Sequence, residues 1–382
     1  MDYRTKILHT GKDRDPFTGA SSIPIYQVST FAQDDPVEFG SYDYARVINP
    51  TRKALEETIA ILESGERGYA FSSGMAAISS VLLLFKPGDH VVVTEDVYGG
   101  TYRILTTLFQ RWGLRHTFVD MTNAANIEEA LLPETKAIFA ETPSNPLLTI
   151  TDLPAVVEIA KKNELLTIID NTFMSPYLQR PIELGFDIVV HSATKFLGGH
   201  SDLIAGLAVT KDKEWGEAIK RIQTGFGSIL GPQDSWLLLR GIKTLSARMD
   251  IQQRNTEIIA EWLSKQDKIQ KVYYPTLPSH PGREIHLKQA SGGGAVVSFE
   301  LENGDIAKEV LRNVKIPLMA VSLGGVESIL SYPTTMSHSA MPEHERHARG
   351  IVDGLVRLSV GLEDPNDLCE DIARAIDTAY NR

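Results

Sequence analysis

The chain has 382 residues, of which 42% are hydrophobic and 23% are charged, so it is long enough for two globular domains and too apolar to be disordered. Its formal net charge of −11 predicts repulsion from phosphate backbones and anionic membranes, which argues against nucleic-acid and membrane-surface roles. A single cysteine excludes an internal disulfide, and we find neither a leader-like apolar segment at the start nor a stretch of about 20 apolar residues, so we expect a cytoplasmic protein.

Residues 1–50 contain many turn formers and little hydrophobic periodicity, which predicts an extended N-terminal arm. From Thr51, the expected N-cap, Leu55, Ile59 and Leu62 recur on one helical face. Beyond this helix, short apolar runs alternate with helical stretches. The predicted strands are His90–Thr94, Thr117–Val119, Ala137–Ala140, Leu166–Ile169, Asp187–Val190 and Ala205–Thr210. The predicted helices are Gly74–Phe85, Tyr102–Trp112, Ile127–Leu131 and Pro154–Lys162.

This alternation predicts an α/β domain over residues 51–240 with a mostly parallel sheet, because uniformly apolar strands are typical of sheets covered on both faces. Ligands of such sheets bind beyond the carboxyl ends of the strands. From residue 241 to 382 we expect a smaller α+β domain that begins with a long helix. Its predicted elements are the helices Ser246–Ser264, Ile306–Arg312 and Asp367–Tyr380 and the strands Ala295–Glu300 and Leu355–Val360. Cys369, in the last helix, is interpreted as a small buried hydrophobe.

Polar side chains follow three consecutive predicted strands. Asn145 lies in the segment after the first of them, Asp170 directly follows the second, and Ser192, Thr194 and Lys195 follow the third. The alternation places all three groups on one edge of the sheet. This set suits pyridoxal 5′-phosphate (PLP), which needs a lysine to carry its aldehyde as a Schiff base, a carboxylate against its pyridine nitrogen and hydroxyls for its phosphate.

A further phosphate contact is predicted at Tyr69–Ala77, which indicates a short buried strand, a tight turn and a helix start. The free amides of Gly74 and Met75 would point at an anion, assisted by the helix dipole. An ordinary serine N-cap is the alternative interpretation. The nearest imitation of a nucleotide-binding motif, over residues 225–231, has one residue too many and no strand before it, which excludes NAD and ATP.

Three histidines near the C-terminus, His338, His344 and His347, allow a remote alternative, a metal-dependent hydrolase. The spacing of three between the last two is not that of a zincin helix, and a solvated face is the favoured interpretation. Two other classes stay open. Transamination is not reported by any motif, and a PLP-binding regulator would need a DNA-binding module that an arm of 50 residues is too short and too acidic to supply.

The chain resembles, over essentially its whole length, the Cys/Met-metabolism family of PLP enzymes, which includes cystathionine lyases and synthases, methionine γ-lyases and acylhomoserine thiolyases. The resemblance is carried by motifs in the family's order: Tyr42–Arg46, Asn49–Thr51, Ser72–Ala76, Tyr98–Thr101, Glu141–Pro146, Asp170–Thr172, Ser192–Lys195 and Arg357–Gly361. It implies the fold type I of PLP-dependent transferases (aspartate-aminotransferase-like), PLP as the cofactor, a small amino-acid substrate and a homotetramer whose active sites are shared across subunits.

The resemblance also implies roles for single residues that contact the cofactor. Lys195 is similar to the lysine that carries PLP and shuttles protons, and Asp170 would pair with the pyridine nitrogen. Tyr98 resembles the ring that stacks on the cofactor, and its phenol could help to move protons. The phosphate would be bound by Gly74, Met75, Ser192 and Thr194.

Two further groups of residues follow from the same resemblance. Tyr44 and Arg46 are similar to the pair that reaches the phosphate of a neighbouring subunit. Arg357 would bind the substrate carboxylate as a fork, with Ser322 and Asn145 assisting, and Asn145 would also lie against the cofactor.

The reaction is predicted from three features. Gly100 stands where methionine γ-lyases have a cysteine, and the length departs from the longer thiolyases. The segment 323–338 is similar to that of bacterial cystathionine β-lyases, although Glu327 and Ser328 also resemble γ-lyases and γ-synthases. We therefore expect β-elimination of L-cystathionine to L-homocysteine, pyruvate and ammonia, a transsulfuration step of methionine biosynthesis. The alternatives within the family are a cystathionine γ-lyase and a γ-synthase or acylhomoserine thiolyase.

Overall fold

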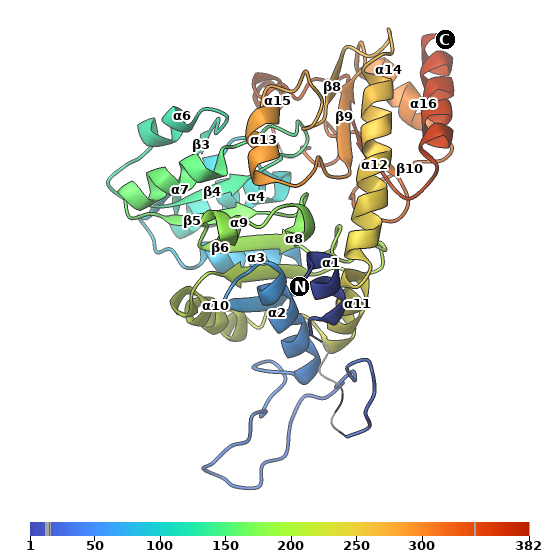
Figure 1. Ribbon diagram of the computed structural model, residues 1–382. Helices are drawn as coiled ribbons and strands as arrows, with labels where there is room; N and C mark the ends of the chain where they lie inside the picture. Colours follow the sequence, from blue (N-terminus) through green and yellow to red (C-terminus); the bar gives the residue numbers. More distant parts are fainter. Residues whose placement is uncertain (12–14, 16, 340, 382) are drawn as a thin grey trace.

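Two β-sheets form the framework of the chain in the computed structural model, which describes residues 1–11, 15, 17–339 and 341–381 (Figure 1). The first sheet has seven strands in the order β1-β7-β6-β5-β4-β2-β3. They are β1 (Arg67–Phe71), β2 (His90–Thr94), β3 (Arg115–Val119), β4 (Thr135–Glu141), β5 (Leu166–Asp170), β6 (Ile188–Ser192) and β7 (Gly206–Thr210).

The first sheet is mostly parallel, as predicted, because β3, β2, β4, β5 and β6 run in one direction. The prediction did not include the antiparallel pairing of β7 with both β6 and β1. The connection between β6 and β7 forms no helix to cross a face of the sheet. The chain therefore reverses direction, and β7 pairs antiparallel with its predecessor.

Helices cover both faces of this sheet, which explains its uniformly apolar strands. Ile169 and Val189 pack in one buried cluster with α2 and α7, whereas Ile168 and Val190 pack in another with α3. The helices of this part are α2 (Pro50–Leu62), α3 (Gly74–Leu82), α4 (Gly99–Ile104), the π-helix η1 (Leu105–Phe109), α5 (Gln110–Trp112), α6 (Ala124–Glu129), α7 (Leu153–Lys162), α8 (Ser175–Leu178), α9 (Pro181–Leu184), α10 (Lys213–Phe226) and α11 (Pro232–Ile242).

The second sheet has five strands in the order β10-β11-β12-β9-β8, with β10 parallel to β11 and the other pairs antiparallel. They are β8 (Lys271–Tyr273), β9 (Val296–Glu300), β10 (Leu318–Met319), β11 (Ile329–Ser331) and β12 (Leu355–Ser359). Its helices are α13 (Arg283–Gln289), α14 (Gly304–Asn313), α15 (Glu343–Ala348) and α16 (Pro365–Tyr380). Cys369 is buried in α16, where burial raises the pKa of its thiol to about 11, in line with the interpretation as a packing residue.

The long helix α12 (Leu245–Leu263) runs from the first sheet to the second (Figure 1). All strands of the first sheet precede residue 241 in the sequence, and all strands of the second follow it. We propose that the two domains divide at this residue. In the described part of the chain no helix is long and apolar enough to cross a membrane.

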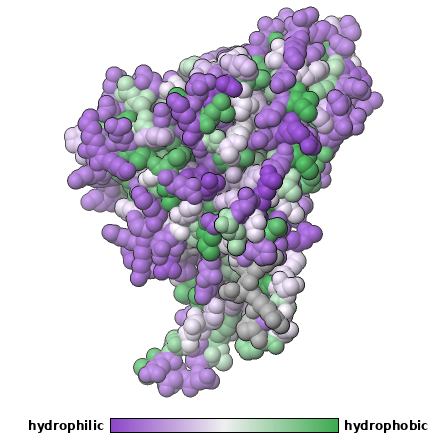
Figure 2. Space-filling view, viewed as in Figure 1, coloured by the Kyte–Doolittle hydropathy of each residue, from purple (hydrophilic) through white to green (hydrophobic). Residues whose placement is uncertain are grey.

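Residues 17–49 form a loop that projects from the body, as expected for an arm, but the first residues form the helix α1 (Tyr3–His9) (Figure 1). The arm exposes Val37 and Phe39, and apolar surface is visible along it in Figure 2. The prediction of Thr51 as N-cap of α2 was wrong. Asn49 caps the helix by accepting from the amide of Thr51, whose own hydroxyl bonds the arm instead.

The predicted helix 102–112 begins earlier, at Gly99, and contains a π-helical turn. The two glycines gave no helix signal. A Cβ atom at Gly99 would lie 2.1 Å from the carbonyl oxygen of Ser337, so glycine is needed for α4 to begin beside that loop. A packing requirement from a distant segment therefore decides where this helix starts.

Candidate active site

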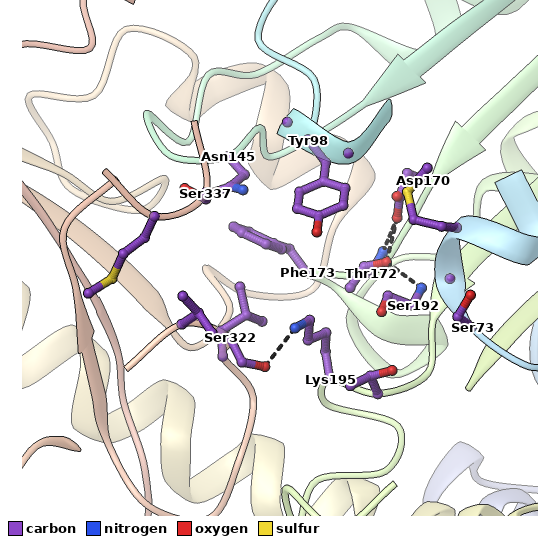
Figure 3. Close-up of a pocket in the computed structure, with 18 of the residues that line it drawn as sticks. Ser73, Tyr98, Asn145, Asp170, Thr172, Phe173, Ser192, Lys195, Ser322 and Ser337 are labelled. Carbon is purple, nitrogen blue, oxygen red and sulfur yellow. Dashed lines mark hydrogen bonds between the residues drawn. The ribbon is translucent and has the colours of Figure 1, made fainter. Parts of the chain in front are cut away.

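A cavity of about 420 Å³ opens at the carboxyl ends of β4, β5 and β6, and residues of both sheets line it (Figure 3). Its position follows the rule for open α/β sheets, and its size is that of a small-molecule site. The cavity brings together ten of the predicted site residues: Gly74, Met75, Tyr98, Asn145, Asp170, Ser192, Thr194, Lys195, Ser322 and Arg357.

Lys195 lies in the turn after β6, and its side chain crosses to the second part of the chain. Its Nζ donates a 2.6 Å hydrogen bond to the Oγ of Ser322 (Figure 3). A Cβ atom at Gly324 would lie 2.9 Å from the carbonyl carbon of Lys195, so a glycine at this positive φ lets the two segments approach. Burial, assisted by the positive charge of Arg357, lowers the pKa of Lys195 to about 8. A much larger share of this amine is thus neutral and nucleophilic near neutral pH than of an ordinary lysine.

This lowered pKa predicts how loading of the apoprotein with PLP depends on pH. Only a neutral amine attacks an aldehyde, and at pH 8 a lysine of ordinary pKa would be neutral in about one molecule in several hundred. We expect the rate of PLP incorporation to rise about tenfold per pH unit below pH 8 and to level off above it. Stopped-flow absorbance measures this rate. A rate that keeps rising to pH 10 would contradict the burial argument.

Asp170 and Glu141 are neighbours in the register of β5 and β4, and both are buried. The Oδ1 atom of Asp170 accepts hydrogen bonds from the amide and the hydroxyl of Thr172 (Figure 3). Burial raises the pKa of both carboxyls, and for Glu141 the charge of Asp170 adds to the effect. A protonated pyridine nitrogen beside Asp170 would offset the cost of burying this charge, so the pair fits the ring of PLP.

The N-terminus of α3 fits the phosphate. The hydroxyl of Ser73 caps the helix by accepting from the amide of Ala76, whereas the amides of Gly74 and Met75 donate no hydrogen bond within the described residues. A Cβ atom at Gly74 would lie 3.0 Å from the Oγ of Ser192, so the free amides and this hydroxyl converge. The predicted serine N-cap is present, and it leaves the two amides of the same turn available for a phosphate.

Thr194 has a different local role from that of Ser192. Its hydroxyl donates to the carbonyl of Ala205 at 3.2 Å and accepts from the amide of Ala205 at 3.1 Å. These bonds fix the turn that carries Lys195 while the residue still lines the cavity.

Arg357 is buried in β12 and joins the two parts of the chain. Its Nη1 donates to the Oδ1 of Asn145 at 2.8 Å, and its Nη2 donates to the carbonyl of Ser322 at 2.8 Å. Burial lowers its pKa to about 10, so the guanidinium is still charged at neutral pH. A positive fork at the cavity wall suits a carboxylate. The Tyr98 ring extends into the same cavity from the start of α4 (Figure 3).

Several cavity residues were not predicted from the sequence. Thr172 and Glu141 stand inside recognised motifs, and a Thr two residues after a strand-end Asp is a signal for the local turn that the structure shows. Arg103 lies in α4 one turn after Gly99, which also lines the cavity, so this spacing would have indicated it once that helix was known. Other lining residues, among them Phe173, Ser337 and Ser339, have no local signal.

Tyr44 and Arg46 do not line this cavity. They lie together on the projecting arm, with the guanidinium of Arg46 at 5.4 Å from the centre of the Tyr44 ring. The Nη1 of Arg46 donates to the carbonyl of Thr224 at 2.9 Å. Within one chain the pair is therefore separate from the ten residues of the cavity.

The structure does not bring the three histidines of the hydrolase alternative together. His338 is fully buried, and burial together with the charges of Arg357, Arg349 and Arg346 lowers its pKa to about 3. A metal ion would meet the same positive field. Among the described residues, the group with metal-ligand geometry contains His347 but neither His338 nor His344. The remote hydrolase alternative therefore finds no support, and the favoured interpretation of a solvated face is wrong for His338, which is buried.

The buried lysine, the strand-end carboxylate and the helix N-terminus with its hydroxyl define the site of a PLP-dependent enzyme of fold type I. Comparison with known proteins agrees: residues 4–377 match the family described as Cys/Met metabolism PLP-dependent enzymes. The chain belongs to this family, and PLP is its cofactor.

Relatives of this family share the whole length of the chain. Cystathionine beta-lyase MetC of Bacillus subtilis is 56% identical over 97% of this chain and 95% of its own, and cystathionine gamma-lyase of the same organism is 51% identical over 99% and 100%. The crystal structure of cystathionine gamma-lyase from Lactobacillus plantarum complexed with L-serine has a TM-score of 0.97 at 46% identity and covers all of both chains. Cystathionine gamma synthase from Xanthomonas oryzae in complex with cystathionine also has a TM-score of 0.97, at 41% identity, with 100% and 99% covered.

Proposed function

We propose that the chain catalyses β-elimination of L-cystathionine, which with one water gives L-homocysteine, pyruvate and ammonia. The observation that carries the substrate class is that two arginines, Arg357 and Arg103, line one cavity. Cystathionine has a carboxylate at each end, and two separate guanidinium groups match this chemistry better than they match an amino acid with one carboxylate. The greater identity to a β-lyase than to a γ-lyase favours the β reaction.

The residues of the cavity can carry out each step around the cofactor. Bound PLP supplies an electron sink for the bonding pair left when a proton leaves the substrate α-carbon. Arg357 holds the carboxylate of the reacting end and so fixes the α-carbon. The neutral Nζ of Lys195 removes the α-proton and, now charged, can deliver it to the departing sulfur. Asp170 would keep the ring nitrogen protonated, and the Tyr98 ring, which lines the same cavity, would lie against the cofactor.

A γ-lyase activity is the second candidate, because a cystathionine γ-lyase is 51% identical to the chain. The sequence features that resemble γ-enzymes, Glu327 and Ser328, do not line the cavity. Ser328 instead donates to Glu363 and accepts from the amide of Gly361. Ser328 therefore fixes the local structure beside the second sheet, and since neither residue lines the cavity, their presence does not favour γ-chemistry through contact with substrate.

Incubation of the PLP-loaded enzyme with L-cystathionine tests the proposal. We expect homocysteine and pyruvate, which chromatography with mass detection separates from the products of γ-cleavage, and no products from Lys195→Ala. Cysteine with 2-oxobutyrate would instead assign a γ-lyase. Synthesis of cystathionine from cysteine and an acylhomoserine would assign a γ-synthase.

We further propose that the arm completes the cavity of a neighbouring subunit in a homotetramer, with Tyr44 and Arg46 at the phosphate. Their distance from the cavity of their own chain and the exposed apolar side chains of the arm, Val37 and Phe39, support this assembly. A cytoplasmic location and a role in methionine biosynthesis belong to the same proposal.

A further inference from the structure

Two buried polar side chains of α12, Arg248 and Gln252, point from one face of the helix toward the backbone behind the cavity. They are 4% and 0% exposed and stand one turn apart, so their side chains lie one above the other. Neither lines the cavity, and the reaction proposed above does not use them. Their hydrogen bonds end on the segments that carry the site residues.

Arg248 holds the turn that follows Lys195. Its Nη1 donates to the carbonyl of Phe196, the next residue, at 2.7 Å, and its Nη2 donates to the carbonyl of Gly241 at 3.0 Å. A Cβ atom at Gly199 would lie 2.1 Å from Nη1, so the turn is closed tightly around the guanidinium. Burial lowers the pKa of Arg248 to about 10, so the guanidinium is still charged at neutral pH. Its two Nη atoms bind backbone carbonyls.

Gln252 holds two segments of the second part of the chain. Its Nε2 donates one N–H to the carbonyl of Gly325 at 2.8 Å and the other to the carbonyl of Val360 at 2.9 Å. Gly325 lies three residues after Ser322, and Val360 lies three residues after Arg357. Both N–H groups of this amide therefore bind backbone carbonyls, one near Ser322 and the other near Arg357.

We infer that Arg248 and Gln252 are positioning residues, which set the place of Lys195 relative to Ser322 and Arg357 through the rigid helix α12. The inference rests on the proposed function, in which Arg357 binds the substrate carboxylate. The site spans two sheets, and its short contacts, 2.6 Å from Nζ to Ser322 and 2.8 Å from Arg357 to Ser322, need both segments in register. A displacement of about 1 Å at such a site can lower the rate on the order of 100-fold.

A matched pair of variants on α12 tests this inference. Gln252→Met removes the two amide bonds at nearly constant volume, and Asn255→Leu removes a comparable buried bond, from its Nδ2 to the carbonyl of Glu363 at 2.8 Å. The probe is L-alanine, which has no leaving group, and its dissociation constant for the PLP-loaded enzyme is measured by calorimetry alongside the melting temperature. We expect Gln252→Met to raise this constant about tenfold, the effect of weakening one buried hydrogen-bonded contact, and Asn255→Leu to leave it within about twofold while lowering the melting temperature to a similar degree.

Arg248→Lys provides the second arm, because it keeps the charge but loses the fork. We expect it to retain PLP and to shift the pH at which PLP incorporation levels off, since the lysine turn is no longer held in place. Equal effects of Gln252→Met and Asn255→Leu on alanine binding, or no effect of either, would overturn the inference. Arg357→Ala tests the proposed function separately from the positioning role of Gln252. If Arg357→Ala leaves alanine binding unchanged, the proposed carboxylate role of Arg357 fails, whatever Gln252→Met does.

Discussion

Replacement of Lys195 by alanine is expected to abolish turnover and to remove the visible absorbance band of the covalently held cofactor. The Nζ of Lys195 is the buried amine that can both bind the aldehyde and move the α-proton. Loss of the proton transfer alone lowers a rate by about 10²- to 10⁴-fold, and loss of the covalent attachment adds to this. Steady-state assays with cystathionine and absorbance spectra of the dialysed protein measure the two losses separately.

Ser322→Ala is the control for that variant, because it removes the hydrogen-bond partner of Nζ and leaves the amine. We expect Ser322→Ala to keep the band and to reduce turnover far less than Lys195→Ala. An alanine variant at position 195 that retains both the band and turnover would show that another amine carries the cofactor, and the assignment of the site would fall.

Asp170→Asn is expected to lower kcat/KM on the order of 10²- to 10³-fold, the range found when one preorganised electrostatic contact is removed. An amide of the same shape can still accept from Thr172 but cannot hold a proton on the ring nitrogen, so the ring becomes a weaker electron sink. We expect PLP to remain bound, because the phosphate contacts around Gly74 and Ser192 are untouched. Kinetic assays and measurement of PLP content after gel filtration check both statements.

Glu141→Gln serves as the comparison, since Glu141 is the neighbouring buried carboxyl. Burial and the charge of Asp170 raise the pKa of Glu141, so a second negative charge beside Asp170 is disfavoured, and glutamine still accepts from the amide of Tyr98. Its effect should be much smaller than that of Asp170→Asn. Equal losses in the two variants would show that the negative charge is shared, and that Asp170 is not the specific partner of the ring.

The sequence allowed prediction of candidate site residues where polar side chains stood within a few residues of the end of an apolar strand. Asp170 and Lys195 were found in this way because the carboxyl ends of parallel strands meet at one edge, a consequence of local pattern and sheet geometry. The helix start at Gly74 was found from its N-cap signal, since a serine before an apolar helical stretch marks the point where the first helical amides lack partners within the helix.

Residues placed by long-range packing could not be predicted from local pattern. Arg357 looked like an ordinary strand arginine until the family resemblance was considered, and Arg103 needed the start of α4, which depends on contact between Gly99 and Ser337. Arg248 and Gln252 lie in a helix that was predicted within one residue at each end, yet three of the carbonyls that they bind lie about 50 to 110 residues away. Hydrophobic periodicity predicts which face of a helix is buried, but it does not predict which segment packs against that face.

The hydrogen bond between Lys195 and Ser322 joins residues 127 positions apart, and the bond between Arg357 and Asn145 joins residues 212 positions apart. Contacts of such sequence separation require the closure of long loops, so they form after the local helices and hairpins during folding. The cavity is therefore completed only when both sheets are in place. During folding, the chain can form most of its helices before it can bind the cofactor. PLP therefore stabilises only the fully assembled fold.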